Sequence, residues 1–400
     1  MKATMNTRFE DRVPVVLMGD LTLVRPLALA GIPLVLVTDD VDDCALHSRL
    51  VRSHLVVAGY VGDARAKTVE ALIRLGEGLR ALHGKKPPLF CGDDTQLELI
   101  YSHRDALAAV FALSLNDADL AWALYDKSTF YPLCERRGIL APRSLDGDSD
   151  ADLERLRAPL LVKPRRKSDL ESLRDPLFGA AAKARIFATH RDLAEHPVWK
   201  SRPHDLLVQE YVGGDIASLC SFHGFADEHH RVLASFCGQK LRTFPAFGGE
   251  SSYIEMLDDE SLTQLGHKLV ADLELVGPFK IDLLRDPRTG ELYTLEVNAR
   301  FTLWSYLGAM NGVNLLTVAY EHLTGDGVLQ PIGGNTSRHR WLSLYRDARA
   351  FAEQRARGEL DLLHWLWSLA NPHNIYEVFA WRDPAPFAHW LRGFLRHKLG

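Results

Sequence analysis

Three polar side chains interrupt the apolar stretch YTLEVNARF, residues 293–301, at intervals of two. Side chains alternate between the two faces of a β-strand, so Glu296, Asn298 and Arg300 are predicted to point the same way. The apolar residues between them are typical of a strand that packs on a core. The stretch therefore predicts a strand that packs with one face and can do chemistry with the other.

A second strand, KIDLLRD, residues 280–286, precedes this one, and the turn signal DPRTG joins the two. If the strands pair about the middle of that turn, Asp282 lies opposite Thr294. Glu296 then lies opposite Lys280. This register places one carboxylate from each strand, together with a neighbouring amide, on one face of a hairpin.

Two carboxylates and an amide on one sheet face suit a hard cation, and an all-oxygen ligand set favours Mg²⁺ over zinc. Mg²⁺ held by few protein ligands usually binds substrate phosphates as well. The planar guanidinium of Arg300 matches a phosphoryl or carboxylate group. The hairpin therefore predicts a nucleoside triphosphate nearby, and the alternative is a surface hairpin with solvated charges.

Two other predicted strands end in residues that suit a nucleotide. PLLVKP, residues 159–164, places Lys163 at the end of an apolar strand, where an ammonium group could meet a phosphate. In DLLVQEYVGGD, residues 205–215, Glu210 is predicted to accept a hydrogen bond from the exocyclic amine of an adenine. The backbone of Val212 is predicted to contact the ring edge.

Taken in order, these pieces resemble the ATP-grasp family over roughly residues 10–325. DKSTFYPLCERRGILAPRS is similar to the family's entry segment, and LLVKP is similar to its nucleotide lysine strand. VQEYVGGD is similar to its hinge and adenine strand, and KIDLLRD with YTLEVNAR is similar to its metal hairpin. Each motif is short, but together they stand in the family's order and spacing.

The resemblance implies a role for each matched residue. Those expected to bind ATP are Lys127, Lys163, Gln209, Glu210, Val212 and Asp215. Those expected to bind two Mg²⁺ ions are Asp282, Glu296 and Asn298. Arg300 is expected to stabilise the phosphoryl group during transfer. Lys240 and Arg242 are expected to approach the γ-phosphate or the substrate carboxylate, and the alternative for this pair is solvated strand charges.

Two loops bear on the substrates. FGGESS, residues 247–252, is similar to a loop that lines the acceptor site. The lid hairpin after the lysine strand is often glycine-rich in the family, but here it carries Arg165, Arg166 and Lys167. Either these basic side chains replace the backbone amides that cover the phosphates, or the lid folds over a larger anionic substrate.

The reaction that the resemblance implies is activation of a carboxylate by ATP to an acyl phosphate, followed by attack of an amine to give an amide, ADP and phosphate. Within the family, the segment RTFPAFGGESS is most similar to carboxylate–amine ligases such as D-aspartate ligase. Phosphoryl transfer, thiol acylation or non-catalytic ATP binding are the alternatives. Small carboxylates and amines, amino acids or peptide-like, are the expected substrates, with Gly19, Asp20 and Arg25 as candidates for their pockets. A homodimer is compatible with the resemblance.

The length of 400 residues predicts more than one core. Alternating strand and helix patterns predict a parallel α/β domain over residues 1–115. An ATP-grasp domain with an antiparallel core is expected over 116–328, with its lid at about 158–212, and a helical extension over 329–400. The expected fold class is therefore mixed, α/β and α+β.

Composition argues against several classes of protein. A formal charge of −5 argues against a nucleic-acid binder. Five widely spaced cysteines, at 44, 91, 134, 220 and 237, signal neither a disulfide framework nor a zinc site, which favours a reducing cytoplasm. The N-terminal segment does not fit a secretory signal, and we expect no membrane span. DEHHR, residues 227–231, is predicted to be a hairpin tip rather than a metal site. The basic amphipathic helix at 387–399 is expected to pack on its own domain rather than on a membrane.

Overall fold

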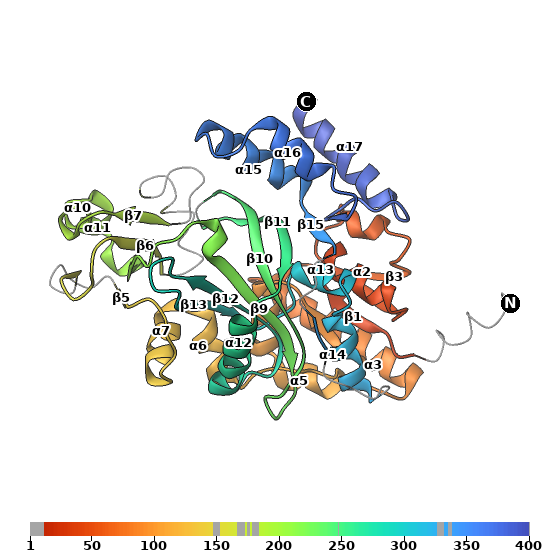
Figure 1. The fold of residues 1–400 in the computed structure, drawn as a ribbon. Coiled ribbons are helices and arrows are strands. Elements are labelled where there is room, and N and C mark those ends of the chain that lie inside the picture. The colour runs from red at the N-terminus through yellow and green to blue at the C-terminus, as the bar shows by residue number, and fades with distance from the viewer. Residues whose placement is uncertain are drawn as a thin grey trace.

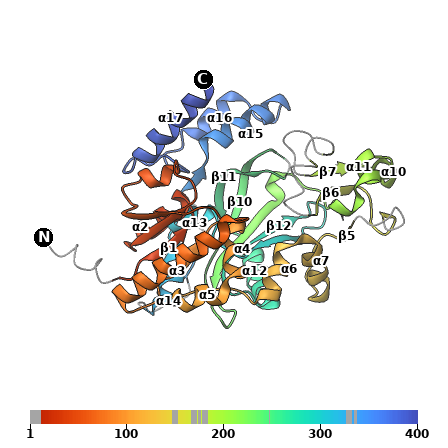
Figure 2. The same cartoon turned by 180° about the vertical axis from the view of Figure 1, so that it is seen from behind.

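The computed structural model describes residues 12–146, 153–165, 173, 177, 184–246, 248–325, 332–334 and 338–399. Within these residues the strands form three sheets: a parallel sheet from the N-terminal segment, a small antiparallel sheet, and a large sheet between them. Figure 1 shows the large sheet at the centre, the small sheet at one side, and the last three helices of the chain above, and Figure 2 shows the same arrangement from behind. The architecture is that of a mixed α/β and α+β protein.

The N-terminal segment forms the parallel sheet that its strand and helix pattern predicts. Its strands, in the order β3-β2-β1-β4, are β1 (Val15–Met18), β2 (Leu34–Thr38), β3 (Ser53–Val56) and β4 (Leu89–Cys91). Its helices are α2 (Leu21–Leu29), α3 (Ala64–His83), α4 (Asp94–Ser102) and α5 (Arg104–Val110). Asp20 and Asp93 follow β1 and β4 and cap α2 and α4 through Thr22 and Thr95. The helix starts therefore meet at the carboxyl edge of this sheet.

The next segment, residues 117–138, forms two helices. These are α6 (Ala118–Tyr125) and α7 (Lys127–Arg136). The break falls at Asp126, whose backbone is extended and whose carboxylate accepts from the Ser128 amide. An N-cap residue must leave the helical conformation, so Asp126 ends one helix and starts the next. As a result Lys127 stands in the first turn of α7.

The small sheet carries the strand with Lys163, which the resemblance predicts to contact the nucleotide. It runs in the order β5-β8-β6-β7, with β5 (Ser144–Asp146), β6 (Leu160–Pro164), β7 (Arg185–Phe187) and β8 (Leu206–Glu210). Every pairing in it is antiparallel. Alternate residues such as Leu160, Val162 and Val208 are fully buried, together with Trp199 of α11 (Pro197–Ser201), beside α10 (His190–Ala194). The sheet therefore has a core of its own.

The large sheet runs in the order β13-β12-β9-β10-β11-β15-β16, and β14 pairs with β10. Its strands are β9 (Leu219–Ala226), β10 (Val232–Phe244), β11 (Glu250–Leu257), β12 (Gly277–Arg285), β13 (Leu292–Asn298), β14 (Ile332–Gly333), β15 (Arg340–Leu342) and β16 (Asn374–Tyr376). Helix α12 (Glu260–Leu273) packs against β9 and β10. The Asp227 amide donates to the Arg231 carbonyl at 3.0 Å between β9 and β10, which confirms the predicted hairpin tip.

The C-terminal helices pack on the rest of the chain. They are α13 (Trp304–Met310), α14 (Leu315–Thr324), α15 (Leu344–Ala356), α16 (Leu362–Leu369) and α17 (Ala385–Leu399). In α17 the His389 ring stacks on His47 at 3.8 Å between centroids, and Trp390 contacts Tyr345 of α15. This confirms that the last helix packs on its own protein. None of the helices within the described residues has both the length and the apolar character needed to span a membrane.

Candidate active site

The hairpin of β12 and β13 has a different register from the predicted one. Asp282 lies opposite Glu296, not Thr294, and Lys280 lies opposite Asn298, not Glu296. The cause is a β-bulge between Asp282 and Leu283: the register passes from Leu283 opposite Thr294 to Asp282 opposite Glu296 and skips residue 295. Thr294 therefore shares the apolar side with Leu283, because cross-strand partners share a face. The correction brings the two carboxylates closer together than predicted.

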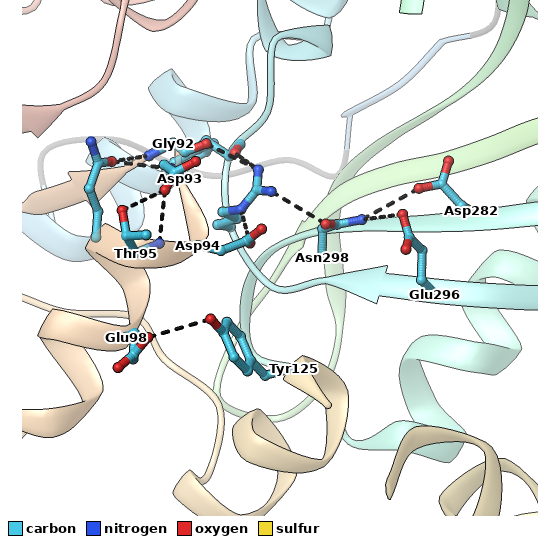
Figure 3. Close-up of polar contacts among 12 residues, drawn as sticks. Gly92, Asp93, Asp94, Thr95, Glu98, Tyr125, Asp282, Glu296 and Asn298 are labelled. Carbon is cyan, nitrogen blue, oxygen red and sulfur yellow. Dashed lines mark hydrogen bonds and ion pairs between the residues drawn. The ribbon is translucent and has the colours of Figure 1, made fainter. Parts of the chain in front are cut away.

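The predicted metal residues form one polar group. The Asn298 amide donates to the carboxylates of Asp282 and Glu296 at 3.4 and 3.5 Å, and Figure 3 shows it beside both. Asp282 is 6% exposed, whereas the side chain of Glu296 is 42% exposed. The polar group is therefore buried at Asp282 and accessible to solvent at Glu296.

Lysine ammonium groups surround these carboxylates. Lys280 and Lys240 approach Asp282 at 2.5 and 4.0 Å, and Lys127 of α7 approaches Glu296 at 3.7 Å. Burial would raise the pKa of Glu296, but Lys127, Lys280, Lys240 and Lys163 outweigh it and hold the pKa well below its usual range. Both signs of charge therefore meet on one sheet face, as binding of Mg²⁺ and phosphate together would require.

The donor set of the hairpin fits Mg²⁺. Two carboxylates and an amide offer only oxygen ligands, and Mg²⁺ usually completes its shell with water and phosphate oxygens. Among the residues that the structure describes, no three histidine, cysteine, aspartate or glutamate side chains gather as a ready-made metal site. With so few protein ligands, a Mg²⁺ ion here would take its remaining oxygen ligands from water and from the phosphates of a nucleotide.

Strand β9 adds two residues to this face that the sequence did not single out. Ser221 lies opposite Asp282, and His223 lies opposite Lys280. The His223 ring is buried between Phe236 and Trp304 and contacts the Ser221 hydroxyl at 2.8 Å. Burial lowers the pKa of His223 well below its usual value, and the nearby lysines lower it further. His223 is therefore neutral at pH 7. Only its pairing with Lys280 in the sheet, which the sequence does not reveal, identifies it as part of this site.

Lys163 reaches the group from the small sheet. Its ammonium donates to the Tyr131 hydroxyl at 2.9 Å, and Tyr131 in turn donates to the Leu295 carbonyl at 2.8 Å. Burial lowers the pKa of Lys163 to about 8, and the charge of Glu296 opposes this shift. The structure thus brings Lys127, Lys163 and the hairpin together, as the sequence predicted.

The predicted adenine residues lie at the end of β8. Gln209 is buried and donates to the Ser144 hydroxyl at 3.4 Å, while the Glu210 carboxylate accepts from the Arg157 amide at 3.0 Å. The Val212 carbonyl accepts from Arg288 at 3.4 Å. Asp215 caps a short 3₁₀ turn through the Ser218 amide at 3.2 Å. These residues follow one another from the end of β8 into the segment that leads to β9.

Arg300 is held away from the carboxylates by the N-terminal sheet. Its guanidinium donates to Asp94 at 2.5 Å, to the Gly92 carbonyl at 3.0 Å and to Asn298 at 3.4 Å. Figure 3 shows Asp94 and Gly92 on one side of this link and Asn298 with its carboxylates on the other. Arg300 therefore joins the start of α4 to the hairpin of β12 and β13.

Arg242 lies in a separate, buried network. Its guanidinium donates to Asp347 of α15 at 2.8 and 2.9 Å and to the Ser368 hydroxyl at 3.0 Å. Asp347 is fully buried and also accepts from Ser252 and Trp365. Nothing in the sequence singles out Asp347, which resembles one charge among many on an amphipathic helix. In this structure Arg242 faces the C-terminal helices, whereas Lys240 faces the hairpin.

The predicted acceptor loop is shorter than expected. Ser251 and Ser252 belong to β11 and are buried, so they are strand residues rather than loop residues. Phe247 lies outside the described residues, as do Arg166 and Lys167 of the basic lid segment. Arg165 is described, and its backbone amide donates to the Asp205 carbonyl at 2.8 Å.

A cavity of about 330 Å³ opens at the carboxyl edge of the parallel sheet. Its lining includes Gly19, Asp20, Thr38, Asp39, Asp40, Asp43, Gly92, Asp93, Thr302 and Leu303. Gly19 and Asp20 were predicted here. Arg25 was predicted too, but it is buried and donates to the carbonyls of Tyr376 and Glu377, so it anchors the C-terminal segment instead.

Comparison with known proteins supports the resemblance. A family model described as an ATP-grasp domain matches residues 126–303. The D-aspartate ligase of Enterococcus faecium (strain Aus0004) is 26% identical over 279 residues, covering 66% of this chain. The alignment spans 65% of the length of that relative.

Solved structures share the fold. N5-carboxyaminoimidazole synthetase from Staphylococcus aureus, complexed with ADP, aligns with a TM-score of 0.57 and 13% identity over 80% of this chain and 79% of its own. An L-amino acid ligase from Bacillus licheniformis aligns with a TM-score of 0.57 and 14% identity over 80% and 77%. The biotin carboxylase domain of a Hydrogenobacter thermophilus carboxylase, in complex with MgADP, aligns with a TM-score of 0.59 and 14% identity. That alignment covers 82% of this chain and 72% of its own. Residues 126–303 of the chain therefore match the ATP-grasp domain family, and the solved structures show that the chain shares the fold.

Proposed function

We propose that the protein is an ATP-dependent carboxylate–amine ligase that works through an acyl phosphate. The observation that carries the proposal is the pairing of Asp282 with Glu296 beside Asn298, with lysines from three other strands or helices directed at them. The sequence similarity to a D-aspartate ligase supports the choice of ligase over the other reactions of the superfamily.

The chemistry uses the chain's own charges. We assign Lys127 and Lys163 to the ATP phosphates, and Gln209, Glu210, Val212 and Asp215 to the adenosine. Asp282, Glu296 and Asn298 would hold two Mg²⁺ ions. When bound, these ions would neutralise the negative charge of the phosphates. A carboxylate oxygen of the substrate attacks the γ-phosphorus and ADP leaves. The amine then attacks the acyl carbon, loses a proton, and expels phosphate.

Lys240 and Arg300 are placed to serve the transferred group. Lys240 already faces Asp282, and Arg300 stands between the hairpin and the cavity through Gly92. Their positive charges would stabilise the anionic phosphoryl oxygens as the group moves. We assign Arg242 no contact with the transferred group. It would act only by fixing strand β10, which also carries Lys240.

We place the small-molecule substrates at the cavity beside the parallel sheet. It meets the ATP-grasp domain at Thr302 and Leu303, just after the hairpin, and shares Gly92 with Arg300. Its lining carries five aspartates and neither lysine nor arginine, so a screen should begin with ammonium-bearing substrates such as amino acids. None of the five cysteines, all described, forms a disulfide, which supports a reducing cytoplasm as the setting.

The test is ADP and phosphate release across pairwise mixtures of carboxylates and amines with ATP and Mg²⁺, with mass detection of the product. We expect release that needs both partners and a product lighter than their sum by one water. Release with a carboxylate alone, trapped as a hydroxamate by hydroxylamine, would support the acyl phosphate and leave the amine to be found. ATP hydrolysis that no pair accelerates would contradict the ligase. Gel filtration of the same sample would test the homodimer that the resemblance suggests.

A further inference from the structure

Helix α7 presents one face to the metal hairpin. Lys127 and Tyr131 are four residues apart on this helix, so their side chains lie on the same side. Lys127 approaches the Glu296 carboxylate at 3.7 Å, and the Tyr131 hydroxyl donates to the Leu295 carbonyl at 2.8 Å. The helix therefore contacts two consecutive residues of β13, one by charge and one by a hydrogen bond.

Leu295 is the residue at which the hairpin bulges. The pairing of β12 with β13 skips it, and this skip sets Asp282 opposite Glu296. A bulge residue is left out of the regular ladder, so its carbonyl needs a partner from elsewhere. The Tyr131 hydroxyl supplies that partner at the position that brings the two carboxylates together.

The same hydroxyl also holds Lys163. A phenol has one proton and can accept with its lone pairs. The proton goes to Leu295, so the oxygen accepts from the Lys163 ammonium at 2.9 Å. Tyr131 is 6% exposed, and burial raises the pKa of its hydroxyl, which stays protonated at neutral pH. One buried oxygen thus joins the small sheet, helix α7 and the metal hairpin.

We propose that Tyr131 is a positioning residue that sets Lys163 for the nucleotide phosphates and supports the bulge that pairs Asp282 with Glu296. The proposal rests on the proposed function, because it assigns Lys163 to ATP. It assigns no chemical step to Tyr131, which acts through Lys163 and Leu295. A phenylalanine there keeps the ring, the packing and the helix, and removes only the shared hydroxyl.

The experiment compares Tyr131→Phe with the wild-type chain by calorimetric titration of a non-hydrolysable ATP analogue with Mg²⁺, and of adenosine. We expect the affinity for the triphosphate to fall by about tenfold, the usual scale for one charge-assisted hydrogen bond. Adenosine affinity should stay at the wild-type value, and the thermal midpoint should fall only by the few degrees that the loss of one buried hydrogen bond costs. The matched control is Tyr125→Phe, whose exposed hydroxyl contacts Glu98 at 3.4 Å, and it should change neither affinity.

A double-mutant cycle with Lys163→Met asks whether Tyr131 acts through that lysine. We expect Tyr131→Phe to weaken triphosphate binding far less in the Lys163→Met background than in the wild type. Unchanged triphosphate affinity in Tyr131→Phe, fully additive losses, or an equal loss of adenosine binding with a lowered midpoint would each overturn the positioning role. If the wild-type chain bound no ATP analogue, the proposed function itself would fail, and the inference with it.

Discussion

Asp282 and Glu296 are direct cross-strand neighbours on β12 and β13, and the Asn298 amide donates to both carboxylates. Two carboxylates at this spacing repel each other unless cations separate or surround them. In the structure Lys280, Lys240 and Lys127 supply positive charge. We infer that the hairpin is built to share its charge with a metal–nucleotide complex.

Glu296→Gln tests the metal hairpin. The substitution keeps size and hydrogen bonding but removes the charge that would bind Mg²⁺, so turnover should fall by at least about a hundredfold. The side chain is 42% exposed, so the fold should survive, but the loss of a charge that faces several lysines should lower the thermal midpoint by a few degrees. Glu291→Gln, an exposed residue of the turn, is the control and should keep full activity. Near wild-type ADP release by the Glu296 variant would show that the metal assignment is wrong.

Asp94→Asn tests how Arg300 is held. Without the carboxylate at 2.5 Å the guanidinium loses its charged partner at the start of α4, and we expect kcat to fall about tenfold with Mg²⁺ affinity unchanged. The control is Glu98→Gln, on the same helix and paired with Arg65 at 2.8 Å. Equal effects of the two substitutions would mean that the Asp94 pair contributes only to stability. A changed Mg²⁺ affinity would place Arg300 in the metal site itself.

The low pKa of Lys163 predicts a pH dependence of ATP binding. Below about 8 the amine is charged and favours phosphate, and above it the proton is lost, so affinity should fall by up to about tenfold per pH unit. In the unfolded chain the pKa returns to its ordinary 10.5, so the unfolded state binds more protons between these values. The contribution of Lys163 to the free energy of unfolding therefore rises with pH. A fall in ATP affinity at high pH cannot then be explained by unfolding caused by this group.

The measurement is the affinity for the ATP analogue from pH 7 to 9.5, in the wild type and in Lys163→Met. The variant should bind weakly at every pH and lose the dependence, while Lys200→Met, an exposed lysine of α11, should follow the wild type. A pH profile that Lys163→Met leaves unchanged would assign the titration to another group.

Asp347→Ala tests the buried network that joins the C-terminal helices to β10 and β11. Removing this carboxylate leaves the Arg242 guanidinium buried without its counter-charge, which typically costs about 3–5 kcal/mol of unfolding free energy. Urea unfolding measures the loss. The control, Glu359→Ala, breaks an exposed pair with Arg357 and should cost less than about 1 kcal/mol. A loss below that value for Asp347 would mean that water or another acceptor replaces it.

Local pattern was enough for much of the fold. The parallel strands, the antiparallel pairing of the later strands and the hairpin tip at 227–231 follow from apolar periodicity and turn residues, which are short-range properties. The division of those later strands into two sheets does not. The gathering of Lys127, Lys163 and the hairpin followed from the family resemblance. The domain limits at 115, 158–212 and 328 stay predictions. The structure defines sheets and hydrophobic cores, and these do not by themselves fix the residue at which one domain ends.

What the sequence could not predict depends on long-range contacts. The bulge at residue 295 shifts the alternation of faces by one residue, but nothing in the residue types around it shows where the shift falls, since it places a threonine on the apolar side. Asp347 becomes important only when α15 packs on β10 and buries it against Arg242. Arg25 was expected in a substrate pocket, but the strand that begins at Asn374 and its following residues cover it.

The most direct test of the central claim follows the oxygen of the substrate. Once a productive carboxylate and amine are known, the carboxylate is labelled with ¹⁸O at both positions and the released phosphate is analysed by mass. Acyl-phosphate formation transfers one carboxylate oxygen to phosphorus, so we predict phosphate carrying one ¹⁸O and an amide retaining the other. Unlabelled phosphate from a productive reaction would contradict the account, because it would show that the carboxylate never bonds to the γ-phosphorus.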